Sequence, residues 1–210
     1  MSLSILIPVY NEIDQLKYTL NKLTKLKKKI NNFEIIFIDD FSNDGSGNYI
    51  KEYSKKKPYI KIFKNKKKGL GSALEEGIKR SRSDYICVFM SDMSDSLEDL
   101  LKYYKIIKEE KIDAVLGSRF LKGSKIKNYP VLKLLLNRLS NKIIKFIFFS
   151  NYNDFTNAFK MYKANGGKWN LRIIGRGDLV ISKQIKGLSI EGFLQPNEIA
   201  DRMNNAKVFV

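Results

Sequence analysis

Short apolar runs that alternate with amphipathic helical patterns constrain the fold of this chain most strongly. Five runs are predicted to be strands, at residues 4–9, 33–40, 59–63, 85–90 and 112–116. Helical patterns follow the first four, through Leu16 to Leu26, from the loop at 42–46 to before Pro58, through Leu74 and Ile78, and over 97–110. This alternation predicts an α/β fold with a Rossmann-like, mostly parallel mixed sheet flanked by helices.

The carboxyl ends of the predicted strands carry polar side chains. The run from Tyr85 to Met90 has no polar alternation, which is typical of a central strand buried on both faces, and Asp92 and Asp95 follow it. One alternative is that these two aspartates only cap the next helix. Ligands of open α/β sheets bind beyond the carboxyl ends of the strands. We therefore expect one functional edge to carry Tyr10, Glu12, Asp39, Asp40, Asp92 and Arg119.

The chain is strongly basic. Its formal net charge of +17 favours polyanionic partners, which are nucleic acid, an anionic membrane surface or phosphorylated ligands. The lysine runs at 27–29, 55–57 and 66–68 are interpreted as solvated surface, and they lack the interleaved aromatics typical of nucleic-acid sites. We therefore expect no nucleic-acid partner. The seven arginines are better site candidates, because a guanidinium binds phosphate bidentately.

Missing residue types exclude several kinds of site. The sequence contains no histidine, which excludes histidine-based acid–base catalysis and histidine-ligated zinc. Cys87 is the only cysteine, so no disulfide forms within the chain and a reducing compartment is expected. We also expect no signal peptide and no membrane-spanning helix. The 210 residues are interpreted as a single domain.

The second half of the chain has a different pattern. Residues 131–149 are strongly apolar but are interrupted by the basic residues Lys133, Arg138, Lys142 and Lys145. This segment is either a buried helix pair or an amphipathic helix in a membrane interface, with its basic residues toward lipid phosphates. Residues 154–162 alternate as a strand that we expect to close the sheet in antiparallel sense. An irregular loop at 164–177, a helix at 178–186 and a strand at 188–193 are predicted to follow.

Seven short motifs occur in a fixed order along nearly the whole chain. They are Ile7-Pro-Val-Tyr-Asn-Glu12, Ile38-Asp-Asp-Phe-Ser-Asn-Asp-Gly45, Gly69-Leu-Gly-Ser-Ala73, Asp92-Met-Ser-Asp95, Gly117-Ser-Arg-Phe120, Asn137-Arg-Leu-Ser-Asn141 and Asp154-Phe-Thr-Asn-Ala-Phe159. Each motif is weak alone, but in this order they are strong. Together they resemble the family 2 glycosyltransferases of GT-A fold, and are most similar to the dolichol-phosphate mannosyltransferase-like branch.

The resemblance implies a role for each matching residue. Residues 1–119 would form the nucleotide-sugar-binding half, and residues 120–210 the acceptor-side half with the amphipathic segment 131–149. The implied catalytic residues are Asp92, Asp95 and Arg119. The implied substrate-binding residues are Pro8, Tyr10, Glu12, Asp39, Asp40, Gly69, Gly71, Arg202 and Lys207. Asp92 is also implied as the ligand of a Mg²⁺ or Mn²⁺ cofactor.

Two motifs depart from the family pattern. Met90 stands where the family has the first aspartate of its metal-binding Asp-x-Asp, and a thioether is a poor ligand for a hard divalent cation. Asp92 would therefore bind the cation together with diphosphate oxygens, water and Asp95. In the segment from Arg202 to Lys207, Ala206 replaces the family's serine and the glycine is absent.

The resemblance implies an inverting glycosyltransferase that moves a hexose from a UDP- or GDP-linked sugar to polyprenyl phosphate. We expect it to be cytoplasmic and peripheral at the inner membrane face, with an integral-membrane partner protein as a further expectation. A first alternative is transfer to a saccharide hydroxyl in envelope polysaccharide synthesis, which needs a general base such as Asp95, Asp154 or Asp178. A second alternative is a non-catalytic nucleotide-sugar-binding protein.

Overall fold

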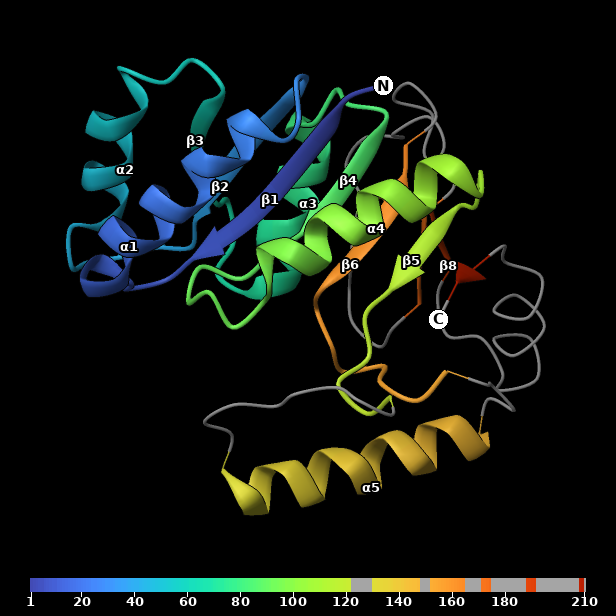
Figure 1. Ribbon diagram of the computed structural model, residues 1–210. Helices are drawn as coiled ribbons and strands as arrows, with labels where there is room; N and C mark the ends of the chain where they lie inside the picture. Colours follow the sequence, from blue (N-terminus) through green and yellow to red (C-terminus); the bar gives the residue numbers. More distant parts are fainter. Residues whose placement is uncertain (122–129, 148–151, 165–170, 175–187, 192–207, 210) are drawn as a thin grey trace.

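The computed structural model describes residues 1–121, 130–147, 152–164, 171–174, 188–191 and 208–209 (Figure 1). The helices, including a short 3-10 helix η1, are α1 (Ile13–Leu23), η1 (Thr24–Lys28), α2 (Ser46–Ser54), α3 (Leu70–Arg80), α4 (Leu97–Glu109) and α5 (Val131–Ile147). The strands are β1 (Leu3–Val9), β2 (Phe33–Asp39), β3 (Ile60–Lys64), β4 (Tyr85–Val88), β5 (Ala114–Leu116), β6 (Lys160–Lys163), β7 (Leu171–Ile174), β8 (Leu188–Glu191) and β9 (Val208–Phe209).

The described strands form one large mixed sheet and one small sheet. The large sheet has seven strands in the order β3-β2-β1-β4-β6-β5-β9, and the small one pairs β7 with β8. In the large sheet, β6 alone runs antiparallel to its neighbours β4 and β5, whereas the other pairs are parallel. The predicted α/β fold with a mostly parallel sheet is confirmed.

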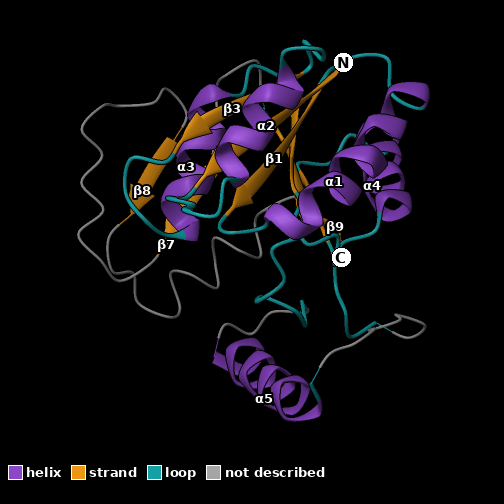
Figure 2. Ribbon diagram, turned by 90° about the vertical axis from the view of Figure 1, so that its left-hand side faces the viewer, coloured by secondary structure: helices purple, strands orange, loops and turns teal. Residues whose placement is uncertain are grey.

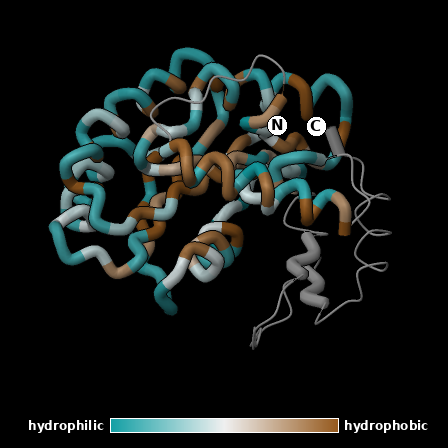
Figure 3. The backbone as a smooth tube through the Cα atoms, turned by 90° about the horizontal axis from the view of Figure 1, so that it is seen from below, coloured by the Kyte–Doolittle hydropathy of each residue, from teal (hydrophilic) through white to brown (hydrophobic). Residues whose placement is uncertain are grey.

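Helices cover both faces of the large sheet (Figure 2). Alternate residues of β1 and β2 point to opposite faces, as strand geometry requires. Leu3, Ile5 and Ile7 pack in one core cluster with residues of α1, α2 and α4, such as Leu16, Ile50 and Leu100. Leu6, Ile36 and Ile38 pack on the other face with Ala73 and Ile78 of α3. The apolar tube segments therefore lie in the middle of the body, with mainly hydrophilic loops and helix surfaces around them (Figure 3).

Strand β4 ends two residues before the predicted boundary at Met90. Phe89 still donates its N–H to the Leu6 carbonyl oxygen at 3.0 Å, but the Met90 N–H is taken by the Asp95 carboxylate at 2.9 Å. A side chain has thus replaced the sheet partner of the backbone. The chain leaves the sheet at this residue, so the loop that carries Asp92 and Asp95 begins two residues earlier than predicted.

The strand predicted at 154–162 is present and antiparallel as expected, but its extent and its place in the sheet were predicted wrongly. Strand β6 begins only at Lys160, and it lies between β4 and β5 instead of closing the sheet. Asn157 explains the late start, because its side chain donates to the Gly117 carbonyl oxygen at 2.7 Å and accepts from the Phe159 N–H at 3.2 Å. Local side-chain bonds of this kind compete with the ladder of a sheet.

The elements predicted for the second half of the chain agree only in part with the structure. Residues 131–147 form one continuous helix and not a helix pair. The segment 164–177, predicted to be an irregular loop, contains β7, whereas the strand predicted at 188–193 is confirmed over the residues of β8. The predicted helix at 178–186 lies outside the described residues.

We predict that Gly77→Ala destabilises the domain by about 1–3 kcal/mol, because overpacking a tight core costs that much. A Cβ at Gly77 would lie 2.8 Å from Ile38 Cδ1 and 3.2 Å from a Leu6 methyl group, where α3 meets the sheet. Gly71→Ala on the same helix is the control, since its Cβ would meet open space. Urea unfolding of both variants tests this, and equal stability of the two would contradict it.

Candidate functional site

Asp39 and Asp40 are adjacent at the end of β2, and their side chains point to opposite faces of the sheet. Asp39 shares its face with α2, and its Oδ1 accepts the Ser42 N–H at 3.0 Å. A Cβ at Gly47 would lie 2.5 Å from Asp39 Oδ2, so glycine is needed for α2 to approach this carboxylate. Both aspartates are buried. The two carboxylates therefore cannot act as one pair.

Asp40 holds the loop that enters α3. Its Oδ1 accepts the Gly69 N–H at 2.9 Å and the Asn65 Nδ2–H at 2.7 Å. Gly69 has φ of +129°, which favours glycine, and it precedes the first residue of α3. Asn65 is buried at the end of β3 and also accepts from the Ser72 hydroxyl at 3.0 Å. Asp40 therefore shapes the glycine loop rather than standing free for a ligand.

The residues that end β1 lie at the same edge. Pro8 is buried in β1, beyond the last residue pair with β4, which joins Leu6 to Val88. Tyr10 is exposed, and Lys68 Nζ lies 4.4 Å from its ring centroid and 3.1 Å from its hydroxyl oxygen. An exposed aromatic ring with a cation on it gives this edge a flat surface suited to a base or a sugar.

Glu12 faces the acidic loop after β4. It precedes α1, its N–H donates to Ser46 Oγ at 2.9 Å, and its carbonyl oxygen accepts from the first turn of the helix. Partial burial, with the nearby charges of Asp92 and Asp44, raises the pKa of Glu12. Strands β1 and β4 thus bring acidic side chains toward one another.

The loop between β4 and α4 places Asp92 and Asp95 in different surroundings. Asp92 is exposed, and its Oδ1 accepts the Ser94 N–H at 2.9 Å. Asp95 turns back to the sheet and accepts the Met90 N–H. Ser96 caps α4, because its hydroxyl oxygen accepts the Asp99 N–H at 3.3 Å. The alternative that the two aspartates only cap this helix is therefore wrong.

Asp95 has a strongly shifted ionisation. Burial raises the pKa of Asp95 to about 6; the charge of Asp92 adds to the rise, while the Met90 N–H and Arg119 oppose it. The charge of Asp92 therefore affects the pKa of both Glu12 and Asp95, and the charge of Arg119 affects the pKa of Asp95, so these four groups lie near one another along one edge. Such a carboxyl can gain or lose a proton near neutral pH.

The residues after β4 provide few ligands for a divalent cation. Within the described ranges, no group of three or more acidic or cysteine side chains gathers as a metal site would require. Asp92 offers exposed hard oxygens, whereas Asp95 is engaged with the backbone and Met90 offers a thioether. This donor set fits Mg²⁺ or Mn²⁺ held by one protein carboxylate together with phosphate oxygens and water, as is usual for Mg²⁺.

Arg119 is bound side-on by a buried carboxylate. Its Nε lies 2.8 Å from Asp154 Oδ2, its Nη2 lies 2.7 Å from Asp154 Oδ1, and its backbone N–H also donates to Asp154 at 2.8 Å. Asp154 is fully buried, while the Arg119 side chain is partly exposed. Because Asp154 neutralises Arg119 inside the protein, it is a poor candidate for a general base.

The structure brings most of the predicted site residues to one edge. Pro8, Tyr10, Glu12, Asp39, Asp40 and Asp92 all lie at or beyond the carboxyl ends of β1, β2 and β4. Gly71, in the first turn of α3, faces open space. Arg202, Lys207 and Asp178 lie outside the described residues.

Several polar residues of this edge were missed from the sequence. Asn65 directly follows β3 as Asp40 directly follows β2, and that position was the available signal. Lys68 was interpreted as part of a solvated lysine run, yet it packs on Tyr10. Asn141 and Thr156 lie in two of the family motifs, but the hydrogen bonds that join them to one another and to Arg119 link distant segments and were not predicted.

A family model described as "Glycosyl transferase family 2" matches residues 4–166. The chain belongs to glycosyltransferase family 2. This family 2 chain is 33% identical over 138 residues to a dolichol-phosphate mannosyltransferase of Pyrococcus furiosus, covering 66% of the chain and 39% of that protein. It is 32% identical over 173 residues to the probable glycosyltransferase YdaM of Bacillus subtilis, and the match covers 79% of this chain and 36% of YdaM. It spans less than half the length of these relatives.

Solved structures share the fold of this family 2 chain. A mannosyl-3-phosphoglycerate synthase from Rubrobacter xylanophilus has a TM-score of 0.60 at 12% identity, covering 78% of the chain and 53% of its own. The mannosyltransferase PcManGT from Pyrobaculum calidifontis, in complex with GDP-Man and Mn²⁺, has a TM-score of 0.53 at 13% identity. The match covers 77% of this chain and 44% of PcManGT. S. aureus TarS 1-349 in complex with UDP-GlcNAc has a TM-score of 0.54 at 20% identity. The match covers 78% of this chain and 45% of the TarS chain. These likenesses confirm the GT-A fold.

We predict that Asp95→Asn gains stability over the native family 2 chain as pH rises from about 4 to 6. The unfolded aspartate has a pKa of about 3.9, so the folded protein, with its pKa of about 6, binds this proton more tightly. The native chain therefore loses this stabilisation as pH rises through the folded pKa, whereas the asparagine variant does not.

Thermal unfolding of both proteins without divalent cations, at several pH values, measures this difference. Asp92→Asn is the companion variant, and it should move the window to lower pH because it removes a charge that raises the pKa of Asp95. A stability difference between Asp95→Asn and the native chain that stays constant across this range would contradict the assignment.

Proposed function

We propose that this chain is an inverting glycosyltransferase that moves a hexose from a UDP- or GDP-linked sugar to polyprenyl phosphate at the inner membrane face. Membership of family 2 supports the transfer of a sugar. PcManGT was solved with GDP-Man and TarS with UDP-GlcNAc, which supports a nucleotide-sugar donor. The edge formed by Tyr10, Asp39 and Asp92 offers an aromatic surface, hydrogen-bond acceptors and a hard carboxylate for such a donor.

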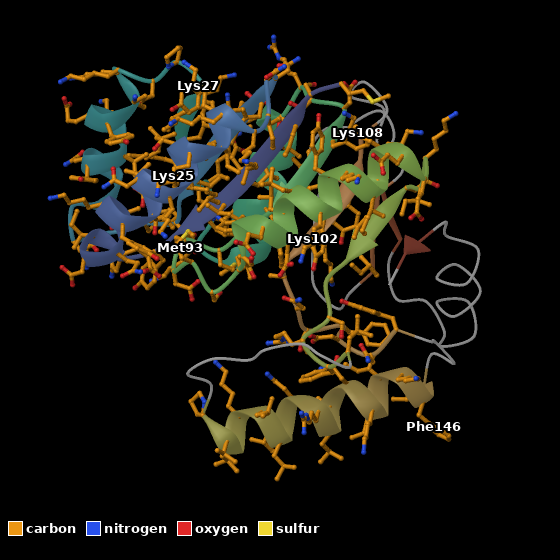
Figure 4. All side chains as sticks on the ribbon, viewed as in Figure 1. Lys25, Lys27, Met93, Lys102, Lys108 and Phe146 are labelled. Carbon is orange, nitrogen blue, oxygen red and sulfur yellow. The ribbon has the colours of Figure 1, made fainter. Side chains whose placement is uncertain are left out.

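The outward apolar face of α5 is the main observation in favour of a lipid acceptor. Helix α5 lies apart from the large sheet, and Phe146 points away from the body (Figure 4). Eight of its large apolar side chains are exposed, from 82% for Val131 to 42% for Ile147. The exposed set is Val131, Leu132, Leu135, Leu136, Leu139, Ile143, Phe146 and Ile147. A helix that turns such a face outward is suited to insertion into a lipid surface.

The charges of α5 favour an anionic bilayer as the partner of this face. At about 100° per residue, Arg138 and Lys145 lie beyond one margin of the apolar arc, Lys142 lies just inside that margin, and Lys133 lies beyond the other. Basic side chains near an anionic membrane contribute about 1 kcal/mol each. No helix in the described ranges is long and apolar enough to cross a bilayer. We therefore propose contact in the plane of the interface.

The proposed reaction needs no general base. An acceptor phosphate oxygen forms a bond to the anomeric carbon, while the bond from that carbon to the diphosphate oxygen breaks and the nucleoside diphosphate leaves with the electron pair. A phosphate monoester has a second pKa of about 6 and is already an anion at neutral pH. The protein's task is to orient the two phosphates and to balance their charge.

Different parts of the site would perform these tasks. Asp92 would hold a divalent cation, which when bound neutralises charge on the diphosphate. Tyr10 would cover the nucleoside, and Asp39 would accept its hydrogen bonds. Arg119, kept in place by Asp154, would face the acceptor phosphate. Arg119 follows β5, and the Thr156 hydroxyl that accepts from it also accepts from Asn141 of α5, which suits that role.

Asp95 favours one alternative, transfer to a saccharide hydroxyl. Its carboxyl has a pKa of about 6, which suits a general base near neutral pH. Its contact with the Met90 N–H argues against this role, because the carboxylate is already engaged with the backbone. Loss of transfer in Asp95→Asn, with a saccharide acceptor only, would support the alternative.

A radiolabelled transfer assay tests the proposed function. Donor UDP- and GDP-sugars are paired with polyprenyl phosphate, with and without Mg²⁺ or Mn²⁺. We expect an organic-soluble product from one donor, and a loss of at least 100-fold in Asp92→Asn because the cation loses its protein ligand. Lys102→Gln, which changes an exposed side chain of α4, is the control and should transfer normally. Full activity in Asp92→Asn would contradict the metal assignment, and no product from any pairing would contradict the function.

Vesicle sedimentation tests the proposed membrane face. The double variant Leu135→Gln/Leu139→Gln should bind vesicles containing anionic lipid at least tenfold more weakly, since each buried leucine contributes about 1.5–3 kcal/mol. Both side chains are exposed, so folding should be unaffected. Tyr18→Gln removes an exposed aromatic from α1 and is the matched control. Equal binding of the double variant and the native chain would contradict the proposal.

A further inference from the structure

Helix α5 contacts the body through a buried polar side chain, Asn141, and through Arg138, whose Cζ lies 5.7 Å from the centroid of the Phe120 ring. Among the described residues of α5, Asn141 is the buried one, at 2% exposure. Its Nδ2 donates to Thr156 Oγ1 at 3.1 Å and to the Asn137 carbonyl oxygen at 2.8 Å, and its Oδ1 accepts the Phe155 N–H at 2.6 Å. No described element packs extensively on α5. The amide of Asn141 is thus central to how this helix is placed.

The Thr156 hydroxyl links Asn141 to Arg119. It lies 2.8 Å from Arg119 Nη2, 3.1 Å from Asn141 Nδ2 and 3.3 Å from Asp154 Oδ1. Guanidinium and amide nitrogens can only donate, so the hydroxyl oxygen accepts from both and its own hydrogen points to the Asp154 carboxylate. All three hydrogen-bonding positions of the hydroxyl are used, and the direction of each bond is determined.

These contacts restrict how Arg119 can be oriented. Asp154 holds Nε and Nη2 in a side-on fork, and Thr156 takes a further bond from Nη2. The fork alone would allow the ion pair to tilt about the carboxylate, whereas the third bond restrains that tilt. The Nη1 edge of the guanidinium, opposite the fork, is thereby given one direction.

We propose that Asn141 positions Arg119 through the Thr156 hydroxyl, so that the placement of α5 sets the direction in which the guanidinium meets an anionic acceptor. Asn141 and Thr156 are positioning residues, because they act through Arg119. The part concerning the acceptor rests on the proposed function, whereas the part concerning the orientation of Arg119 does not.

The test compares Thr156→Val, which removes the hydroxyl and keeps the shape, with Thr156→Ser, which keeps the hydroxyl. Nitrogen-15 NMR of the arginine side chains follows Arg119, whose signals are assigned by their loss in Arg119→Lys. We expect hydrogen exchange at Nη2 to rise about tenfold in Thr156→Val and in Asn141→Leu, with Thr156→Ser close to the native chain. Unchanged exchange in Thr156→Val would overturn the proposal, whether or not any transfer activity is found.

Kinetics supply the second readout. In Thr156→Val, the KM for polyprenyl phosphate should rise about tenfold while the KM for the nucleotide sugar stays the same, and Thr156→Ser should restore the native value. An equal rise of both constants, with a lowered Tm, would show a structural role only and would overturn the positioning role. Absence of transfer in the native chain would count against the proposed function and leave the NMR result to decide the orientation of Arg119.

Discussion

The acceptor side of this domain depends on one buried charge, the carboxylate of Asp154. A carboxylate removed from water costs several kcal/mol unless a partner and hydrogen bonds compensate it. Arg119 supplies the opposite charge, with a backbone N–H and the Thr156 hydroxyl as further donors. These partners come from the end of β5 and from the loop before β6, and through Asn141 the cluster extends to α5. Satisfying Asp154 therefore brings three distant segments together.

The nucleotide side depends on the alternation of side chains along β2. Because neighbouring residues of a strand point to opposite faces, Asp39 faces α2 and Asp40 faces α3. Each carboxylate meets a glycine on its own side, Gly47 beside Asp39 and Gly69 beside Asp40. Asp40 thereby shapes the loop before α3, whereas Asp39 accepts the Ser42 N–H on the other face. Two adjacent aspartates thus have different tasks.

Much of the fold could be predicted from the sequence, because each strand and helix of the first 116 residues has its own hydrophobic period. The position of β6 could not, since pairing between distant strands leaves no local pattern. The end of β4 could not be predicted either, because it depends on the Met90 N–H donating to the Asp95 carboxylate. The sequence left residues 131–149 as either a buried helix pair or an amphipathic helix. It did not show which face is turned outward, because Asn141 faces the body through contacts with Thr156 and Phe155, which lie in another segment.

The most direct measurement is photo-crosslinking of a polyprenyl phosphate analogue, with its reactive group beside the phosphate, in anionic vesicles. We expect peptide mass spectrometry to place the label on the outward face of α5 and on residues 117–121 near Arg119, with competition by unlabelled polyprenyl phosphate. Labelling spread over the lysine runs at 27–29 and 55–57, without such competition, would contradict the proposed acceptor and the proposed role of α5.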